Sequence, residues 1–253
     1  MNSNFIIMCT KDGTIKKTRL EAYSRPRQNG VNAIVIREGD QLIEAKLTSG
    51  NAEVMIAARD GKAIRFNEST VRPIGRVGAG VRGISIEDGD EVVGMICVEK
   101  DRKEDILVVS EHGYGKRTLV SEYQRKGRGI RGVITISTKE RNGRMVSAVL
   151  TDPDDEIMML TTGGKVVRTS ASEVSIVNRA AMGVRLINPG DDTLASVRRV
   201  AVKSADDELE KLNIEVSDED LLVDEDPADD ESETPETDSD NAVDVDGDDQ
   251  DQN

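Results

Sequence analysis

Residues 113–136 read GYGKRTLVSEYQRKGRGIRGVITI, and the order of features in this stretch decides the predicted fold. A tight turn at Gly113 leads into a strand with two adjacent cations, and then into a loop over residues 124–132 that is rich in glycine and arginine. A β-branched strand ends the stretch at Ile136. Weaker copies of this order recur along most of the sequence, so we base the prediction of the fold on the repeats.

Each copy is recognised by a glycine at its first hairpin turn. The four glycines are separated by 48, 52 and 51 residues: Gly13, Gly61, Gly113 and Gly164. We expect four strands in each copy. They are residues 5–10, 15–18, 33–36 and 42–47; 54–57, 64–66, 84–86 and 92–96; 106–109, 116–118, 132–136 and 145–149; and 157–160, 166–169, 183–187 and 194–197. Four short strands in a period of about fifty residues, without helical periodicity, predict an all-β fold of propeller-like blades, each a four-stranded antiparallel sheet.

Charge divides the chain into a basic body and an acidic tail. From Ser204 to the end the sequence has 23 Asp and Glu against one Lys, and residues 1–203 have 33 Lys and Arg against 26 Asp and Glu. We therefore expect a blade domain over residues 1–203, with repeats at about 4–50, 51–103, 104–153 and 154–203. Residues 204–253 are expected to be an acidic, largely disordered tail, with a short helix possible over 205–214. The basic body indicates an anionic partner, for which the tail is a competitor or a solubiliser.

Composition limits the kinds of site that this body can hold. Trp is absent and only five residues are Phe or Tyr, so phosphate contact rather than base stacking is the expected mode of nucleic-acid binding. Cys9 and Cys97 each lie in an apolar run, which favours reduced core residues of a cytosolic protein over a disulfide. No apolar run reaches membrane-spanning length, and residues 1–8 have no signal-peptide pattern, although their abrupt entry into a strand suggests that further sequence belongs upstream.

Catalytic, metal and cofactor sites are not predicted. His112 is the single histidine and lies at a hairpin turn, where a solvated side chain is expected. No Cys/His cluster has the spacing of metal ligands. Aspartates recur at the turns, and we interpret them as turn formers rather than acid/base pairs: Asp12, Asp40, Asp60, Asp90 and Asp191.

A column of cations is the strongest functional signal from the residues alone. Four positions after each marker glycine stand Lys17, Arg65, Arg117 and Arg168. In one copy such a cation would be interpreted as a solvent-facing residue that protects a sheet edge. Because all four copies share it on a basic body, we favour a ring of like-charged sites around a rim. The loop over residues 124–132, with four cations and three glycines, would reinforce this rim at phosphates, although it could also be a flexible basic surface loop.

Several motifs resemble the C-terminal domain of the A subunit of bacterial DNA gyrase, which is a type IIA topoisomerase. They occur in order between residues 4 and about 203. They are residues 53–56 (EVMI), 62–66 (KAIRF), 80–84 (GVRGI), 113–118 (GYGKRT), 121–123 (SEY), 132–136 (GVITI), 138–143 (TKERNG) and 173–176 (EVSI).

The resemblance implies a β-pinwheel, a propeller relative with usually six blades in which neighbouring blades exchange strands. It also implies that the basic perimeter wraps double-stranded DNA with positive handedness, as part of ATP-dependent negative supercoiling. The implied partners are DNA, the remainder of the gyrase A subunit and the gyrase B subunit, in an A2B2 complex. The implied location is the bacterial cytoplasm, in association with the nucleoid. ATP and Mg²⁺ would be used by other domains, with no cofactor in this chain.

The resemblance, applied residue by residue, makes a set of cations candidates for DNA contact. They are Lys16, Lys17, Arg19, Arg65, Arg82, Lys116, Arg117, Arg125, Lys126, Arg128, Arg131, Arg168 and Arg185.

The sequence also departs from the family pattern. Four repeats are present where six are usual, so we expect a C-terminal piece of a gyrase A subunit whose first sheet lacks the strands that a missing neighbour would lend. Tyr23, Tyr114 and Tyr123 all lie within blade repeats, so the cleavage tyrosine is not among them and the chain is not expected to cleave DNA unaided. Two alternatives stay open: a propeller-like protein-interaction module, and the equivalent domain of the topoisomerase IV A subunit.

Overall fold

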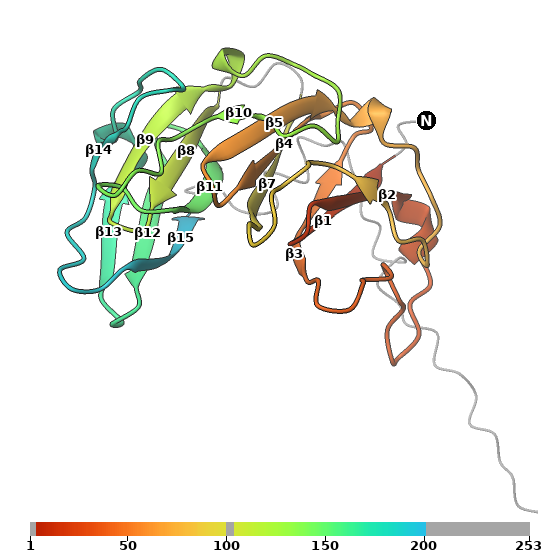
Figure 1. Cartoon of the computed structure of the whole chain (residues 1–253). Helices are drawn as coiled ribbons and strands as arrows, with labels where there is room; N and C mark the ends of the chain where they lie inside the picture. Colours follow the sequence, from red (N-terminus) through yellow and green to blue (C-terminus); the bar gives the residue numbers. More distant parts are fainter. Residues whose placement is uncertain (1–3, 100–103, 201–253) are drawn as a thin grey trace, which may run out of the picture.

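Four β-sheets follow one another along an arc in the computed structural model, which describes residues 4–99 and 104–200 (Figure 1). The strands are β1 (Phe5–Thr10), β2 (Thr14–Arg19), β3 (Leu42–Thr48), β4 (Glu53–Ala58), β5 (Lys62–Asn67), β6 (Val81–Arg82), β7 (Val92–Val98), β8 (Asp105–Ser110), β9 (Tyr114–Leu119), β10 (Val133–Ile134), β11 (Met145–Thr151), β12 (Glu156–Thr161), β13 (Val166–Ser170), β14 (Val184–Arg185) and β15 (Leu194–Val200). A short 3₁₀ turn follows the second strand of each repeat: η1 (Leu20–Tyr23), η2 (Glu68–Thr70), η3 (Val120–Glu122) and η4 (Ala171–Glu173). The predicted all-β fold is confirmed.

Neighbouring repeats exchange a strand. The sheet orders are β3-β1-β2-β6, β10-β5-β4-β7, β11-β8-β9-β14 and β13-β12-β15. The two-residue strands β6, β10 and β14 therefore each leave their own repeat and pair, antiparallel, with the second strand of the repeat before it. This exchange is the arrangement that the resemblance implied.

The direction of the exchange corrects one expectation. The first sheet has four strands, and the fourth sheet has three among the described residues, so the expectation of an incomplete first sheet is wrong. Each of the first three sheets is completed by the repeat that follows it and not by the one before it.

The strands expected over residues 33–36 and 84–86 are not strands in the structure. In the second repeat the exchanged strand lies slightly earlier, at β6, because only this part pairs with β2. In the first repeat, residues 33–36 have no preceding blade among the described residues to pair with, and Val35 and Ile36 are exposed. A β-branched run thus becomes a strand here only where a neighbouring edge accepts it.

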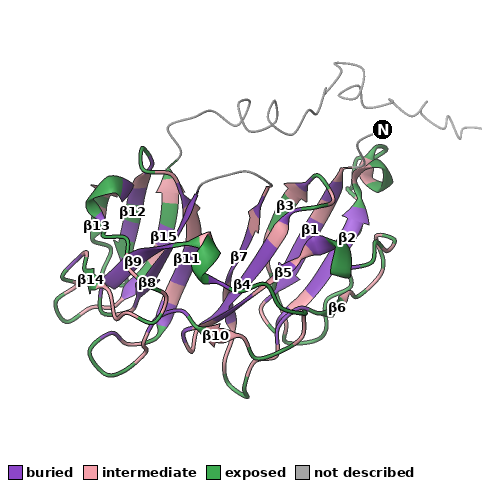
Figure 2. Ribbon diagram, turned by 90° about the horizontal axis from the view of Figure 1, so that it is seen from above, coloured by how far each residue is buried: buried purple, intermediate pink, exposed green. Residues whose placement is uncertain are grey.

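The hydrophobic core lies between the sheets rather than within one of them. In β4, Val54 and Ile56 pack in a cluster with the first sheet, and Met55 and Ala57 pack in a cluster with the third. A further cluster joins the third and fourth sheets around Leu107 and other residues. Because successive side chains of a strand point to opposite faces, the middle strands are apolar on both faces and are buried from both sides (Figure 2). Full burial of one such aliphatic side chain stabilises the fold by about 1.5–3 kcal/mol.

The marker glycine at the first hairpin turn is needed because the segment around the exchanged strand of the next repeat passes close to this turn. Gly113 has φ of 77°, and a Cβ there would lie 2.2 Å from the carbonyl oxygen of Ile187. The carbonyl of Gly113 accepts the amide of Leu186 at 2.8 Å. The turn and the close approach of the following repeat thus require the same residue.

Other sequence-based expectations concern single residues. Cys9 and Cys97 are both free, as predicted, and burial raises the pKa of the Cys9 thiol to about 12. His112 is exposed at its turn. The acidic tail and its short helix lie outside the described residues. Over residues 4–99 and 104–200, no helix is long and apolar enough to cross a membrane.

Candidate nucleic-acid interface

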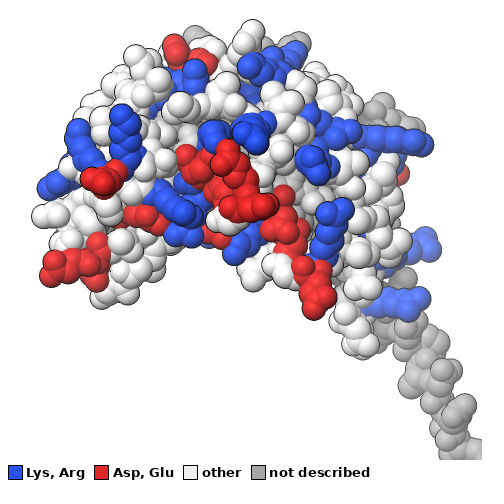
Figure 3. All heavy atoms as spheres, in the orientation of Figure 1, with Lys and Arg blue, Asp and Glu red and all other residues white. Residues whose placement is uncertain are grey.

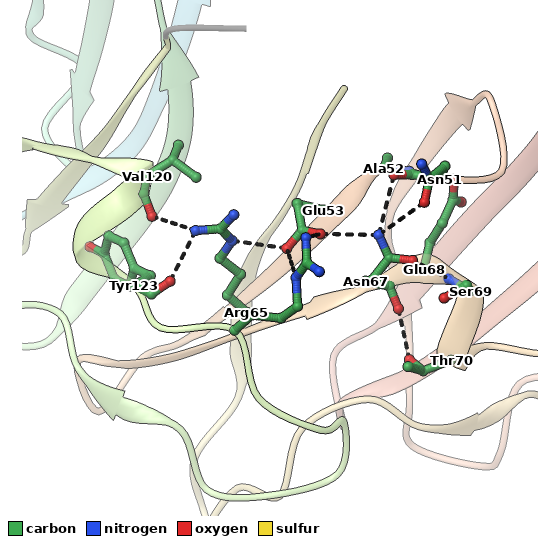
Figure 4. A network of polar contacts seen from close by, with 11 residues as sticks. Asn51, Ala52, Glu53, Arg65, Asn67, Glu68, Ser69, Thr70, Val120 and Tyr123 are labelled. Atoms are coloured by element: carbon green, nitrogen blue, oxygen red, sulfur yellow. Dashed lines mark hydrogen bonds and ion pairs between the residues drawn. The ribbon is translucent and has the colours of Figure 1, made fainter. Parts of the chain in front are cut away.

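The cation column joins neighbouring blades. The Nη1 atom of Arg65 in β5 donates to the carbonyl oxygens of Val120 at 2.9 Å and Tyr123 at 3.0 Å, both at the η3 turn of the next repeat (Figure 4). The Nε atom of Arg65 donates to Glu53 of its own sheet at 3.0 Å. The same guanidinium therefore links a carboxylate in one blade to main-chain carbonyls in the next.

Lys17 and Arg117 likewise donate to main-chain carbonyls of the next repeat. The Nζ atom of Lys17 donates to the carbonyl of Glu68 at 2.9 Å, and the Nε atom of Arg117 donates to the carbonyl of Val174 at 2.9 Å. Lys17 is 3% exposed and Arg117 is 5% exposed. We call Lys17, Arg65 and Arg117 the interblade clamps.

The interpretation of this column as a rim of exposed sites is wrong for Lys17 and Arg117, which are buried between sheets. The physical reason is that these positions face the next blade, and main-chain carbonyls satisfy the buried charge there. Arg168 differs because the fourth sheet has no following blade among the described residues. Its side chain is 62% exposed and pairs with Glu156.

Lys16 and Lys116 are also buried, with 1% and 0% exposure. The ammonium group of Lys116 donates to the carbonyls of Asn178 at 2.9 Å and Arg179 at 2.5 Å. Burial, with a smaller effect from the charge of Arg179, lowers the pKa of Lys116 to about 8. Burial also lowers the pKa of Lys16, which donates to the carbonyls of Ala33 and Arg76. These two lysines hold loops and are not placed on the surface for phosphate contact.

The outer edge of the arc is built by four loops, which we call the rim loops: residues 20–32, 68–80, 120–132 and 171–183. Each of the last three lies along the second strand of the preceding sheet, where a loop amide donates to the carbonyl of an interblade clamp. These bonds are Ile74 to Lys17 at 2.9 Å, Lys126 to Arg65 at 2.8 Å and Val177 to Arg117 at 2.9 Å. The exchanged strands and the rim loops thus lie on the convex side of the arc (Figure 1).

Arginines join one rim loop to the next. Arg128 donates to the carbonyls of Thr70 at 3.2 Å and Arg82 at 3.1 Å, both in the second repeat. Arg179 of the fourth repeat donates in the same way to the carbonyl of Ile134 in the third. The outer edge is therefore a continuous surface from the second repeat to the fourth.

Most of the other candidate cations are exposed at this edge or close to it. On the face in view, Lys and Arg spread over the outer curve of the arc, and Asp and Glu gather mainly toward its middle (Figure 3). The exposed candidates are Arg19, Arg82, Arg125, Lys126, Arg131, Arg168 and Arg185, and Arg128 is half-buried.

Ion pairs on the rim leave these cations accessible. Arg125 pairs with Glu53 at 2.5 Å while its side chain stays 61% exposed, and Arg131 pairs with Glu87 at 3.5 Å with 73% exposure. Exposed pairs contribute about 0–1 kcal/mol, so a phosphate can replace the carboxylate at small cost. Their contact with DNA stays a prediction.

Tyr114 positions one of the arginines of the outer edge. The Nη2 atom of Arg185 donates to the Tyr114 hydroxyl at 2.7 Å, and the guanidinium of Arg141 lies 4.4 Å from the centre of the ring. Hydrogen bonds from Arg141 and Arg185 lower the pKa of Tyr114. Tyr114 thus holds two guanidinium groups against its ring near the strand β14.

Several rim-loop arginines are missing from the sequence-based candidates. Arg25, Arg27 and Arg72 are exposed in the first two rim loops. Arg76 and Arg179 belong to a second column, which stands four residues before the glycines of the exchanged segments and also contains Arg128. Counting backward from Gly80, Gly132 and Gly183 would have found this column.

A chain of ion pairs connects the first three sheets at their hairpin ends. Lys11 pairs with Glu91 at 2.7 Å, Glu91 with Arg59 at 3.0 Å, and Arg59 with Glu111 at 2.7 Å. These cations are balanced by carboxylates from the neighbouring blade. We therefore assign them to the joining of the sheets and not to the candidate interface.

One family of known proteins matches the chain at each repeat. Its model, described as "DNA gyrase C-terminal domain, beta-propeller", matches residues 4–49, 52–99, 104–152 and 155–201. The chain is 44% identical over 219 residues to the A subunit of DNA gyrase from Salmonella typhimurium (strain LT2), a match that covers 85% of this chain and 25% of that protein. It is 40% identical over 216 residues to the A subunit of DNA gyrase from Staphylococcus aureus (strain MRSA252), covering 85% and 24%. The chain thus spans about a quarter of the length of these relatives.

Two solved structures have a similar fold. A structure of a DNA gyrase A C-terminal domain superposes with a TM-score of 0.69 at 27% identity, covering 79% of this chain and 67% of that one. A crystal structure of the C-terminal domain of a DNA topoisomerase IV superposes with a TM-score of 0.74 at 26% identity, covering 84% and 65%.

Proposed function

The chain belongs to the DNA gyrase C-terminal domain family of β-propellers, and from this membership we propose that it is the DNA-wrapping part of a gyrase A subunit. In this role it binds a duplex along the outer edge of the arc and bends it around the blades. The whole enzyme then uses the wrapped segment for ATP-dependent negative supercoiling.

The observation that carries this proposal is the continuous outer edge of rim loops with exposed cations. Arg82, Lys126, Arg131 and Arg185 lie on rim loops or exchanged strands of three successive repeats. A duplex carries one charge about every 1.7 Å of its axis, so cations repeated along an arc meet successive phosphates. Contacts of this kind give affinity without sequence preference.

The interblade clamps support wrapping without touching DNA. Each one fixes the 3₁₀ turn of the following repeat against the second strand of its own sheet, and the rim loop follows that turn. The spacing of the rim loops, and so the curvature offered to the duplex, depends on these contacts.

The remaining parts of the proposal concern the whole enzyme. We place the chain in an A2B2 complex with the remainder of the A subunit and with the gyrase B subunit. Other domains of this complex use ATP and Mg²⁺ and cleave DNA. We place this complex in the bacterial cytoplasm, associated with the nucleoid.

A second candidate is the equivalent domain of a topoisomerase IV A subunit, which is favoured by the structural likeness to such a domain. The two sequence relatives at 44% and 40% identity are both gyrase A subunits, which favours the first candidate. Supercoiling of relaxed plasmid by the complete parent enzyme distinguishes the two, because only a gyrase introduces negative supercoils.

A mobility-shift titration tests the proposed function. The 253-residue chain and a chain ending at residue 203 are titrated against a duplex of mixed sequence at low salt. We expect binding that is insensitive to sequence and that weakens steeply as salt increases. Absence of binding by the folded chain ending at residue 203 would overturn the proposal.

A further inference from the structure

Two exposed arginines meet at Tyr114, at the outer edge of the third sheet. The Nε and Nη2 atoms of Arg185 donate to the Tyr114 hydroxyl at 3.2 and 2.7 Å, and the guanidinium carbon of Arg185 lies 5.1 Å from the centre of the ring. The guanidinium carbon of Arg141 lies 4.4 Å from the same centre, and Arg141 also bonds to the hydroxyl. Neither arginine makes an ion pair with a carboxylate of the described residues.

Three segments of the chain converge on this group. Tyr114 begins β9, Arg185 ends the exchanged strand β14 of the fourth repeat, and Arg141 lies in the turn between β10 and β11 (Figure 1). The strands β14 and β9 pair in a register that places Arg185 opposite Tyr114. The two arginines thus come from different repeats, and they meet because a strand is exchanged between these repeats.

Asn142 fixes the turn of the third repeat against the exchanged segment of the fourth. Its side chain is 0% exposed, and its Nδ2 atom donates to the carbonyl of Met182 at 2.9 Å, three residues before Arg185. The amide of His112 donates to the carbonyl of Asn142 at 3.0 Å, and the Nδ1 atom of His112 lies 3.1 Å from the carbonyl oxygen of Arg141. The main chain on both sides of the pair is therefore fixed, which lowers the cost of ordering the two guanidinium groups around a ligand.

The equivalent place on the second sheet has a different balance of charge. Lys62, the residue after the marker glycine there, pairs with Asp60 at 2.5 Å and with Glu87 at 3.5 Å. The third repeat has His112 in the place of Asp60. It has Lys139 in the place of Glu87, since the carbonyl of each accepts the amide three residues later in its turn. Both carboxylates of the second sheet are thus replaced by residues without negative charge.

The turn that carries Arg141 is also one residue longer than its equivalent in the second repeat. Met145 follows Gly132 by 13 residues, whereas Val92 follows Gly80 by 12. The longer turn reaches the ring of Tyr114 and adds a second guanidinium there. Two like charges on one ring repel each other, and an anion between them relieves this repulsion.

A phosphate group fits the charge and the donors of this pair. Arginine has a planar fork of N–H donors that matches the oxygens of a phosphate. The unesterified oxygens of a phosphodiester can accept from the forks of Arg141 and Arg185 at once. Because β14 lies at the outer edge among the rim cations, the phosphates of a duplex that follows this edge pass the pair.

We propose that Arg141 and Arg185, held on Tyr114, form a site for a single phosphate group, which fixes the duplex at the junction of the third and fourth repeats. The source of the phosphate rests on the proposed function, whereas the site itself does not. Tyr114 is a positioning residue that orients both guanidinium groups. Because the two arginines bind the same phosphate, they act as a unit, in contrast to rim cations that contact separate phosphates.

NMR of the tyrosine rings tests the site without relying on DNA. The chain has three tyrosines, so ¹³C-labelled rings give few signals, and Tyr114→Phe identifies the signal of Tyr114. Inorganic phosphate is titrated into the full chain at constant ionic strength, with chloride as the replaced anion, and a duplex of mixed sequence is titrated separately. We expect both ligands to shift the Tyr114 signal in the wild type, and neither to shift it in Arg141→Gln/Arg185→Gln.

A double-variant cycle on duplex affinity distinguishes one shared phosphate from two separate ones. We expect Arg141→Gln and Arg185→Gln each to weaken binding by about tenfold, and the double variant to bind little more weakly than either, because each change removes the same contact. The slope of log affinity against log salt should become less steep by about 1 in the double variant. The control is Arg144→Gln, an exposed arginine three residues after Arg141, which should change affinity by less than about twofold. Circular dichroism checks the fold of each variant.

Several results would overturn the proposal. They are a Tyr114 signal that neither ligand moves, a signal that inorganic phosphate moves but a bound duplex does not, and a slope that changes by about 2, as for two separate phosphates. The wild-type titrations do not depend on the folding of any variant. If the folded wild type binds no duplex, the proposed function fails, and the titration with inorganic phosphate alone decides whether the site exists.

Discussion

The guanidinium of Arg65 donates to the carbonyl oxygen of Tyr123 at 3.0 Å, although the two residues belong to different repeats (Figure 4). Glu53 accepts from the same guanidinium within the sheet of Arg65. A cation that stands at one position in every repeat is thus used to join blades in the first three repeats. The cations expected to bind phosphate lie instead on the rim loops, which these joints hold in place.

Replacement of Arg65 by Gln should lower the free energy of unfolding, because Arg65 joins two blades. The change removes hydrogen bonds to two carbonyls and one carboxylate in a partly buried site, so we expect a loss of about 1–3 kcal/mol in the free energy of unfolding. Urea unfolding measures it. The matched control is Arg168→Gln, which removes the equivalent cation where it is exposed and should change stability by less than about 0.5 kcal/mol. Equal losses for the two variants would contradict the clamp role.

Neutralisation of the third rim loop should reduce the salt dependence of DNA binding. In the double variant Lys126→Gln/Arg131→Gln two exposed cations are lost, and each phosphate contact contributes about 0.9 to the slope of log affinity against log salt. We expect the slope to become less steep by about 2, with stability unchanged, as measured by fluorescence anisotropy. Lys46→Gln, on β3 at the opposite edge of its sheet, is the control and should leave the slope as it is. If Lys46→Gln had the larger effect, the outer edge would not be the DNA surface.

Lys116 should make stability depend on pH in the alkaline range. Its pKa is lowered by burial from 10.5 to about 8, so between these values the unfolded chain holds a proton that the folded chain has released. The free energy of unfolding therefore rises with pH across this window through this group, by on the order of 3 kcal/mol. In Lys116→Ile this contribution is absent, and Ile64 shows that the second sheet accepts an isoleucine at the equivalent position. Denaturant unfolding of both proteins at a series of pH values should show the wild type gaining stability relative to Lys116→Ile as pH rises, and parallel curves would contradict the assignment.

Removal of the acidic tail should strengthen DNA binding at low salt. The segment from Ser204 onward carries 23 acidic residues against one Lys, and its charge opposes that of the body. We expect the chain ending at residue 203 to bind a duplex more tightly than the full chain, with the difference disappearing as salt screens both charges. Equal affinities of the two chains at low ionic strength would show that the tail does not compete.

The sequence predicted the fold because its signals are local. Marker glycines and apolar strand residues recur in each copy, and the structure forms strands where most of them were expected. Residues 33–36 are an exception, because whether they pair depends on the presence of a neighbouring sheet and not on their own propensity.

The candidate site was predicted less well because burial of a cation depends on contacts between repeats. Lys17 and Arg117 look like surface residues until the next blade is placed against their face. One signal was available for Lys116: the equivalent positions hold Lys16, Ile64 and Val167, and a column that mixes lysine with aliphatic residues is typical of a buried site with a satisfied charge. The loop over residues 124–132, which was predicted as a basic loop of the rim, keeps exposed cations because it lies on the outer edge.

The change in linking number that the chain imposes on closed circular DNA tests the proposed wrapping most directly. The chain is bound to a relaxed plasmid at low salt, free supercoils are removed by a type I topoisomerase, and the topoisomers are separated after the protein is removed. We expect positive supercoils that increase with the amount of wild-type chain and are reduced in Lys126→Gln/Arg131→Gln but not in Lys46→Gln. An unchanged linking number at concentrations that saturate the plasmid would contradict wrapping along the outer edge.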